Sequence, residues 1–181
     1  PDNDSVAVGV SYNSGLKGEI IIIKNWGYGF YDGYETVFET TVPVNAVVVH
    51  PEKAGLMFAG AGSFFAPVAP GGLYISRNSG ANWTKVLLFR DVIVNSIAIA
   101  PSNSDIIYAG CGGSNTSYSG IFKSTDAGTT WTLKTDGLPP SFSVRDIMID
   151  RANSDIVYAV LYKGSSDTSS NLGGTYITLD G

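Results

Sequence analysis

The residues of this sequence that could do chemistry are carboxylates and aromatic rings in segments rich in Gly, Ser and Asn. The candidate catalytic residues are Asp91, Asp136 and Asp167. Two carboxyl groups can act as general acid and general base on a glycosidic bond, and inversion requires about 6.5–9.5 Å between them. The candidate ligand-binding residues are Phe64, Phe65, Tyr118, Tyr162 and Arg90. Aromatic rings offer flat apolar faces that suit a sugar; the alternative is that they cover the cores of their own loops.

Other kinds of site are not indicated. The formal net charge is −5 and the 11 Lys and Arg residues are scattered, whereas a nucleic-acid site needs them clustered. His50 is the sole histidine and has no Cys or carboxylate at the spacing of metal ligands. Cys111 is the sole cysteine, which excludes an intrachain disulfide. No apolar run approaches the roughly 20 residues that span a bilayer. We predict no metal, no cofactor, no nucleic-acid partner and no membrane span.

An internal repeat organises the chain. An apolar segment with Val at its first position recurs at residues 44–51, 94–101 and 144–151, so its starting points are 50 residues apart. A period of this length with several short strands in each repeat is typical of a β-propeller. Abundant Gly, Tyr, Val, Ile, Ser and Thr also favour an all-β fold.

Each repeat divides into four short strands, for example residues 94–100, 106–110, 120–124 and 131–134. The first strand is apolar at nearly every position, which suits an inner strand covered by neighbouring blades on both faces. We therefore predict an all-β fold of β-propeller blades, each of four antiparallel strands, with about 3.5 blades present. The predicted blade repeats within the partial propeller of residues 1–181 are 1–43 (incomplete), 44–93, 94–143 and 144–181 (incomplete).

The number of blades, about 3.5, predicts an incomplete ring. We expect a parent propeller of about seven blades, which the remaining blades or a second chain would close. Two blade edges would otherwise be exposed, so we expect residues 1–181 to fold poorly on their own.

A Ser-x-Asp-x-Gly-x-x-Trp motif joins the third and fourth strands of the repeat. Its two full copies are Ser124, Asp126, Gly128 and Trp131, and Ser76, Asn78, Gly80 and Trp83. A further copy begins at Thr178, and a degenerate one at Ile23. The Asp can accept backbone N–H bonds within its own turn, the Gly can adopt a positive φ, and the Trp can fill the space between blades. Because Asn replaces Asp in one copy, we interpret the motif as structural.

With this motif, the chain resembles the aspartate-box propellers, also called BNR repeats. The stretch from Gly120 to Trp131 is close to their shared pattern, and the resemblance covers essentially the whole chain. Such repeats occur in sialidases, xyloglucan-active endoglucanases, sortilin-type receptors and photosystem-assembly factors. The style of the repeats is most similar to the xyloglucanase-like and sortilin-like propellers.

The resemblance implies an extracellular or cell-surface protein that binds or acts on a polysaccharide or other glycan, as a xyloglucanase-like glycoside hydrolase would. That family uses two Asp residues in a cleft between two propellers, but its Thr-Asp-Val-Gly-Gly-x-Tyr-Arg segment is absent here. Residues 171–176 echo it without the Asp. Whether the chain is an enzyme therefore stays open. The alternative is a non-catalytic propeller scaffold for protein–protein interaction or surface-layer assembly.

Overall fold

A computed structural model describes residues 6–12, 17–23, 34–63, 71–86, 92–112, 119–134, 136–139, 142–163 and 173–181. These residues form β-strands and turns, and no helix among them is long and apolar enough to cross a membrane. The strands of the first two sheets are β1 (Val6–Tyr12), β2 (Lys17–Ile23), β3 (Tyr34–Thr40), β4 (Val44–Val49), β5 (Met57–Ala61), β6 (Gly72–Ser76) and β7 (Thr84–Lys85). Those of the last two sheets are β8 (Ile93–Ile99), β9 (Ile107–Gly112), β10 (Gly120–Ser124), β11 (Thr132–Lys134), β12 (Phe142–Ile149), β13 (Val157–Lys163) and β14 (Gly173–Thr178).

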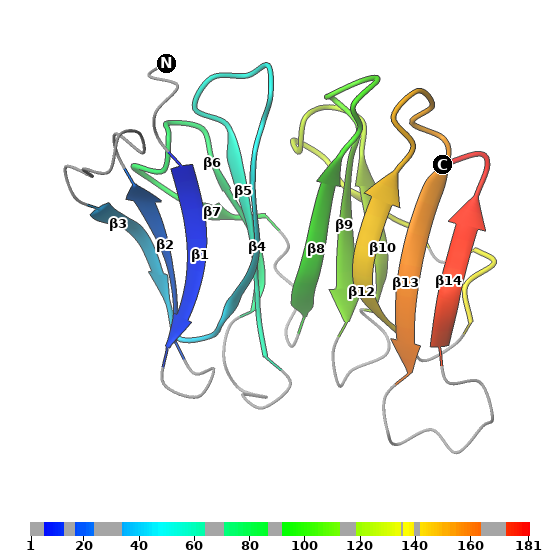
Figure 1. The fold of residues 1–181 in the computed structure, drawn as a ribbon, viewed down its shortest axis with the longest axis horizontal. Coiled ribbons are helices and arrows are strands. Elements are labelled where there is room, and N and C mark those ends of the chain that lie inside the picture. Colours follow the sequence, from blue (N-terminus) through cyan, green and yellow to red (C-terminus); the bar gives the residue numbers. More distant parts are fainter. Residues whose placement is uncertain are drawn as a thin grey trace, which may run out of the picture.

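The strands are arranged in four antiparallel sheets, each following the chain order. The first sheet is β1-β2-β3, the second β4-β5-β6-β7, the third β8-β9-β10-β11 and the fourth β12-β13-β14. The sheets stand side by side (Figure 1), with β1 against β4, β4 and β5 against β8, and β8 and β9 against β12. This confirms the predicted all-β fold of propeller blades, in which the complete blades have four strands.

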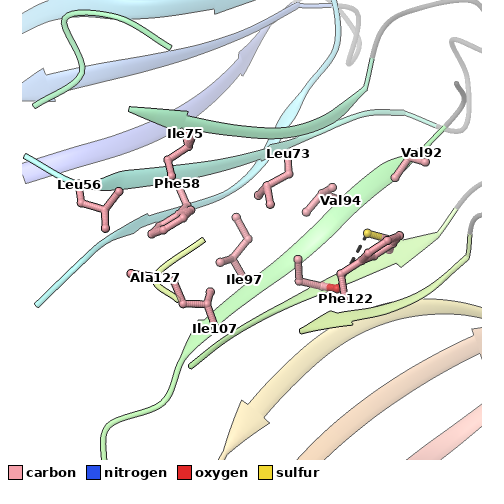
Figure 2. Close-up of a cluster of buried hydrophobic side chains, with 12 residues drawn as sticks. Leu56, Phe58, Leu73, Ile75, Val92, Val94, Ile97, Ile107, Phe122 and Ala127 are labelled. Carbon is pink, nitrogen blue, oxygen red and sulfur yellow. Dashed lines mark hydrogen bonds between the residues drawn. The ribbon is translucent and has the colours of Figure 1, made fainter. Parts of the chain in front are cut away.

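The main core lies between the second and third sheets. Phe58 and Leu73 of the second sheet meet Val94 and Ile97 of the third, and Phe122 lies in the same cluster (Figure 2). Every residue of β5 and β9 is buried, because each of these strands has a sheet on both sides. The nearly continuous apolar sequence of these segments follows from this double burial.

Glycines allow neighbouring sheets to approach closely. A Cβ atom at Gly110 of β9 would lie 2.5 Å from Val144 Cγ1 of β12, and one at Gly60 of β5 would lie 2.7 Å from Val94 Cγ1 of β8. Since Cβ contacts this short do not occur, the two interfaces depend on the missing side chains.

An irregularity in each inner strand adds a polar link between sheets. The register shifts between Val44 and Ala46 in β4 and between Val94 and Ser96 in β8, so Asn45 and Asn95 occupy the bulged positions. Asn45 Nδ2 donates to the Val94 carbonyl (3.2 Å). Asn95 Nδ2 likewise donates to the Val144 carbonyl (2.7 Å). The same link therefore joins the second sheet to the third and the third to the fourth. Arg145 takes the bulged position in β12.

Candidate functional site

The turn that follows β10 holds its acidic residue in a network of local hydrogen bonds. The Ser124 hydroxyl donates to Asp126 Oδ1 (2.8 Å) and accepts the Gly128 N–H (2.9 Å). Asp126 Oδ1 accepts the N–H groups of Thr129 (3.0 Å) and Thr130 (2.8 Å), and Oδ2 accepts the Thr130 hydroxyl (2.7 Å). These bonds, first those from Thr130, lower the pKa of Asp126 to about 2. The carboxylate is thus a hydrogen-bond acceptor for its own turn and is poorly suited to act as an acid near neutral pH.

The turn that follows β6 makes the same contacts without a charge. The Ser76 hydroxyl donates to Asn78 Oδ1 (3.0 Å) and accepts the Gly80 N–H (2.9 Å). Asn78 Oδ1 accepts the Asn82 N–H (2.9 Å). Because an amide serves here as well as a carboxylate, the contact needs an acceptor oxygen and no ionisable group.

The tryptophan after each of these two turns packs toward the preceding sheet. Trp131 is half-buried against the core between the second and third sheets, and its Nε1 donates to the Gly128 carbonyl (3.1 Å). Trp83 packs in the smaller cluster between the first and second sheets, with its ring centroid 5.4 Å from that of Phe38. Each indole therefore fills an interface between two sheets.

A third turn, after β14, has the geometry of the first half of the other two. Thr178 Oγ1 donates to Asp180 Oδ1 (2.6 Å), as Ser124 does to Asp126. The Gly181 N–H donates to the Asp155 carbonyl (3.0 Å), and Gly181 has a φ of 74°. The corresponding Ala127 has a φ of 53° and donates its N–H to the Asp105 carbonyl (3.0 Å). The turn at residues 178–181 therefore has the same conformation as residues 124–127.

A hollow of 590 Å³ lies between the third and fourth sheets. Apolar atoms of Tyr108 on β9 and of Ala159 and Tyr176 on the fourth sheet form much of its wall. Polar groups stand at its two ends, with Asp136 after β11 and Asp180 after β14. The size and the mixture of rings and carboxylates suit a ligand or a large side chain.

Two candidate site residues lie where strands end at one rim of the sheets. Antiparallel order brings the ends of β5, β7, β9, β11 and β13 to the same side (Figure 1). Of the candidates, only Asp136 and Tyr162 lie in the part of the chain that the structure describes. The others lie outside the described residues: Asp91, Asp167, Phe64, Phe65, Tyr118 and Arg90.

The structure does not bring Asp136 and Tyr162 together. Asp136 lines the hollow, whose wall on β13 is formed by Val157 and Ala159. Tyr162 is 50% exposed and alternates with these residues along the strand, so its side chain lies on the opposite face of the fourth sheet. Sequence reasoning also missed Tyr176 as part of the hollow, although its place before the third turn matches that of the buried Phe122 before the second.

The opposite face of the fourth sheet is apolar and open. Met148, Tyr158 and Ile177 are direct neighbours across β12, β13 and β14, and Met148 and Ile177 are more than half exposed. Val160 and Tyr162 of β13 extend this face. No sheet among the described residues covers this face.

His50 and Cys111 have structural surroundings. His50 is buried, and its Nε2 donates to the Ser104 carbonyl (3.0 Å) while its Nδ1 accepts backbone N–H groups. Burial raises the pKa of the Cys111 thiol well above its usual range. No group of three or more His, Cys, Asp or Glu side chains within the described ranges is placed to hold a metal ion.

Solved structures of other proteins share the fold of this chain. No protein-family model and no curated protein matches the sequence. The structure resembles that of an ancestral GH74 enzyme, with a TM-score of 0.64 and 22% identity over 98% of this chain. It resembles the GH74 xyloglucanase from Xanthomonas campestris with a TM-score of 0.62 and 15% identity over 97% of this chain. The chain spans 22% and 27% of the lengths of these two proteins.

A protein of another activity shares the architecture. Oligopeptidase B from Leishmania major matches 89% of this chain and 23% of its own length, with a TM-score of 0.50 and 13% identity. At these identities the matches establish the β-propeller fold, which serves several chemistries.

Proposed function

We propose that the chain forms part of a glycan-binding β-propeller of the glycoside-hydrolase kind. The supporting observation is the match to two GH74 enzymes, one of them a xyloglucanase, over 97–98% of this chain. On this proposal the aspartate-box turns are scaffold, and function resides on the rim from which the longer connecting segments leave the sheets.

The chemistry on that rim would come from carboxylates and rings. Asp136 is the candidate carboxylate that the structure describes, and Asp91 and Asp167, which lie outside the described residues, are the other two candidates. Two of these residues would act as general acid and base if their carboxyl groups lie about 6.5–9.5 Å apart, as inversion requires. Aromatic residues of the same segments would stack on the sugar rings.

Glycan binding and hydrolysis by the purified protein test this proposal. We expect binding to one polysaccharide class in a panel of xyloglucan, β-glucans and sialylated glycans, with release of reducing sugar if the carboxylates are catalytic. Two of the three variants Asp91→Asn, Asp136→Asn and Asp167→Asn should then abolish release without weakening the fold. Glu35→Gln, on the exposed side of the first sheet, is the matched control. Folded protein that neither binds nor cleaves any of these glycans would refute the proposal.

A non-catalytic scaffold that binds another protein is the second candidate. The exposed apolar face of Met148, Tyr158, Val160, Tyr162 and Ile177 is where a further blade of the predicted ring, or a partner protein that completes the ring, would pack. Replacement of Met148 and Ile177 by Thr would then abolish partner binding and leave glycan binding unchanged.

We further propose an extracellular or cell-surface location, where polysaccharides are accessible. An antibody against the chain should detect it in the medium or on intact cells of the source organism. Detection only after lysis would contradict this location.

A further inference from the structure

The turn that follows β6 contains an acceptor sequence for an N-linked glycan. Asn82, Trp83 and Thr84 form the pattern Asn-x-Ser/Thr, in which the middle residue is not Pro. This pattern becomes a glycosylation site where it lies at the surface of a secreted protein. Two further copies begin at Asn3 and Asn115 and lie outside the described residues. Of the three copies, the one at Asn82 is therefore the one whose surroundings the structure gives.

Both residues that define the acceptor sequence are at the surface. Asn82 and Thr84 are exposed, whereas Trp83 between them is half-buried. Trp83 packs in the cluster between the first and second sheets, so it holds the backbone at this point while its two neighbours face solvent. A bulky hydrophilic group on Asn82 can therefore be accommodated without any change in the core.

The exposure of Asn82 does not depend on how the ring is completed. The second sheet has neighbours on both sides, because β1 lies against β4 on one side and β8 lies against β4 and β5 on the other. The strand that follows Asn82 is β7, the outermost of the sheet order β4-β5-β6-β7. Further blades would be added beside the first or the fourth sheet, so Asn82 stays at the outer edge of its own sheet.

The turn does not use the side chain of Asn82. In the equivalent turn after β10, the Thr130 hydroxyl donates to Asp126 Oδ2 (2.7 Å). In the turn after β6, Asn82 contributes its backbone N–H to Asn78 Oδ1 (2.9 Å). No described residue forms a hydrogen bond with the Asn82 carboxamide. Its Nδ2 is therefore available to a sugar.

We propose that Asn82 carries an N-linked glycan. Its Nδ2 forms a bond to the anomeric carbon of an oligosaccharide, the bond from that carbon to a lipid diphosphate breaks, and one Nδ2 proton passes to solvent as the lipid diphosphate leaves. The inference rests on the proposed extracellular or cell-surface location, because the modification belongs to secreted proteins. The glycan stands beside β7, where its bulk hinders pairing of this sheet edge with strands of other molecules.

Peptide mapping of the protein that the source organism secretes is the direct test. Trypsin releases residues 78–85, Asn-Ser-Gly-Ala-Asn-Trp-Thr-Lys. Peptide N-glycosidase in water labelled with heavy oxygen should convert Asn82 to labelled Asp, which mass spectrometry locates within this peptide. Unmodified Asn82 in protein recovered from the medium or the cell surface would overturn the glycan alone. Protein found only after lysis would overturn the location and the glycan together.

Three variants secreted by one yeast host separate Asn82 from the other acceptor sequences. Asn82→Thr introduces the residue that the equivalent turn has at Thr130, so the variant should fold normally and lose one glycan on an electrophoresis gel. Thr84→Ala should lose the same glycan although Asn82 is still present, and Thr84→Ser should retain it. Equal mobility shifts on deglycosylation of the wild type, Asn82→Thr and Thr84→Ala would overturn the proposal.

Discussion

His50 and Asp150 show how different side chains perform one task at equivalent places in the repeat. His50 Nδ1 accepts the N–H groups of Glu52 (3.2 Å) and Lys53 (3.0 Å). Asp150 Oδ1 accepts those of Ala152 (2.8 Å) and Asn153 (3.0 Å). In both cases a side-chain acceptor closes the turn after the inner strand. His50 also reaches the third sheet through Ser104.

Replacement of His50 separates these two contributions. His50→Ala should lower the free energy of unfolding by about 2 kcal/mol, because a buried carbonyl and two N–H groups lose their partners. His50→Asp should cost less, since the carboxylate can close the turn as Asp150 does. Urea denaturation followed by circular dichroism gives both values. Equal losses for the two variants would show that turn closure contributes little.

The pKa of Asp126 predicts a pH dependence of stability. An Asp in an unfolded chain has a pKa of about 3.9, whereas hydrogen bonds lower that of Asp126 to about 2 in the folded state. Ionised Asp126 therefore stabilises the fold fully above about pH 4, and this contribution is lost as the pH falls toward about 2. The difference in melting temperature between the wild type and Asp126→Asn should shrink over this interval. A difference that is constant with pH would contradict the assignment.

At the scale of elements, the sequence was sufficient to predict where the strands lie, but not on which face of its sheet each side chain lies. The 50-residue spacing and apolar inner segments sufficed to locate β4, β8 and β12, because double burial leaves a continuous apolar signal. The bulges at Asn45 and Asn95 could not be predicted, since a register shift depends on the partner strand. Which face of the fourth sheet borders the hollow depends on how the sheets pack, so the sequence does not separate Tyr162, which lies on the opposite face, from Asp136, which lines the hollow.

Close packing at glycine gives a prediction for the interface between the third and fourth sheets. Gly110→Ala should destabilise the fold by about 1–3 kcal/mol, because its Cβ would overlap the stiff Val144 side chain. Gly174→Ala is the matched control, since among the described residues the atom nearest to its Cβ is Tyr176 Cε2 at 3.8 Å. We expect that control to change stability by less than about 0.5 kcal/mol. Similar chemical-denaturation midpoints for both variants would show that the sheets can separate at low cost.

For the whole molecule, the open face of the fourth sheet should govern behaviour in solution. Met148 and Ile177 are 58% and 55% exposed and flank Tyr158 in one cross-strand row. We expect the isolated chain to melt broadly and to associate as its concentration rises, because this face buries apolar surface only on contact. The Met148→Thr/Ile177→Thr double variant should reduce association in sedimentation velocity. A sharp melt of a monomeric wild type would contradict this expectation.

The asparagine links between sheets also bear on how such chains can change in length. The third repeat contains both the carbonyl of Val94, which receives the link from the second repeat, and the amide of Asn95, which makes the link to the fourth. A gene that gains residues 94–143 a second time by unequal crossing-over would therefore encode a ready-made junction on both sides. The lengthened protein should melt no lower than the original, whereas a duplication of half that segment should prevent folding. A chain of this architecture can thus gain whole repeats while every interface between sheets keeps its existing contacts.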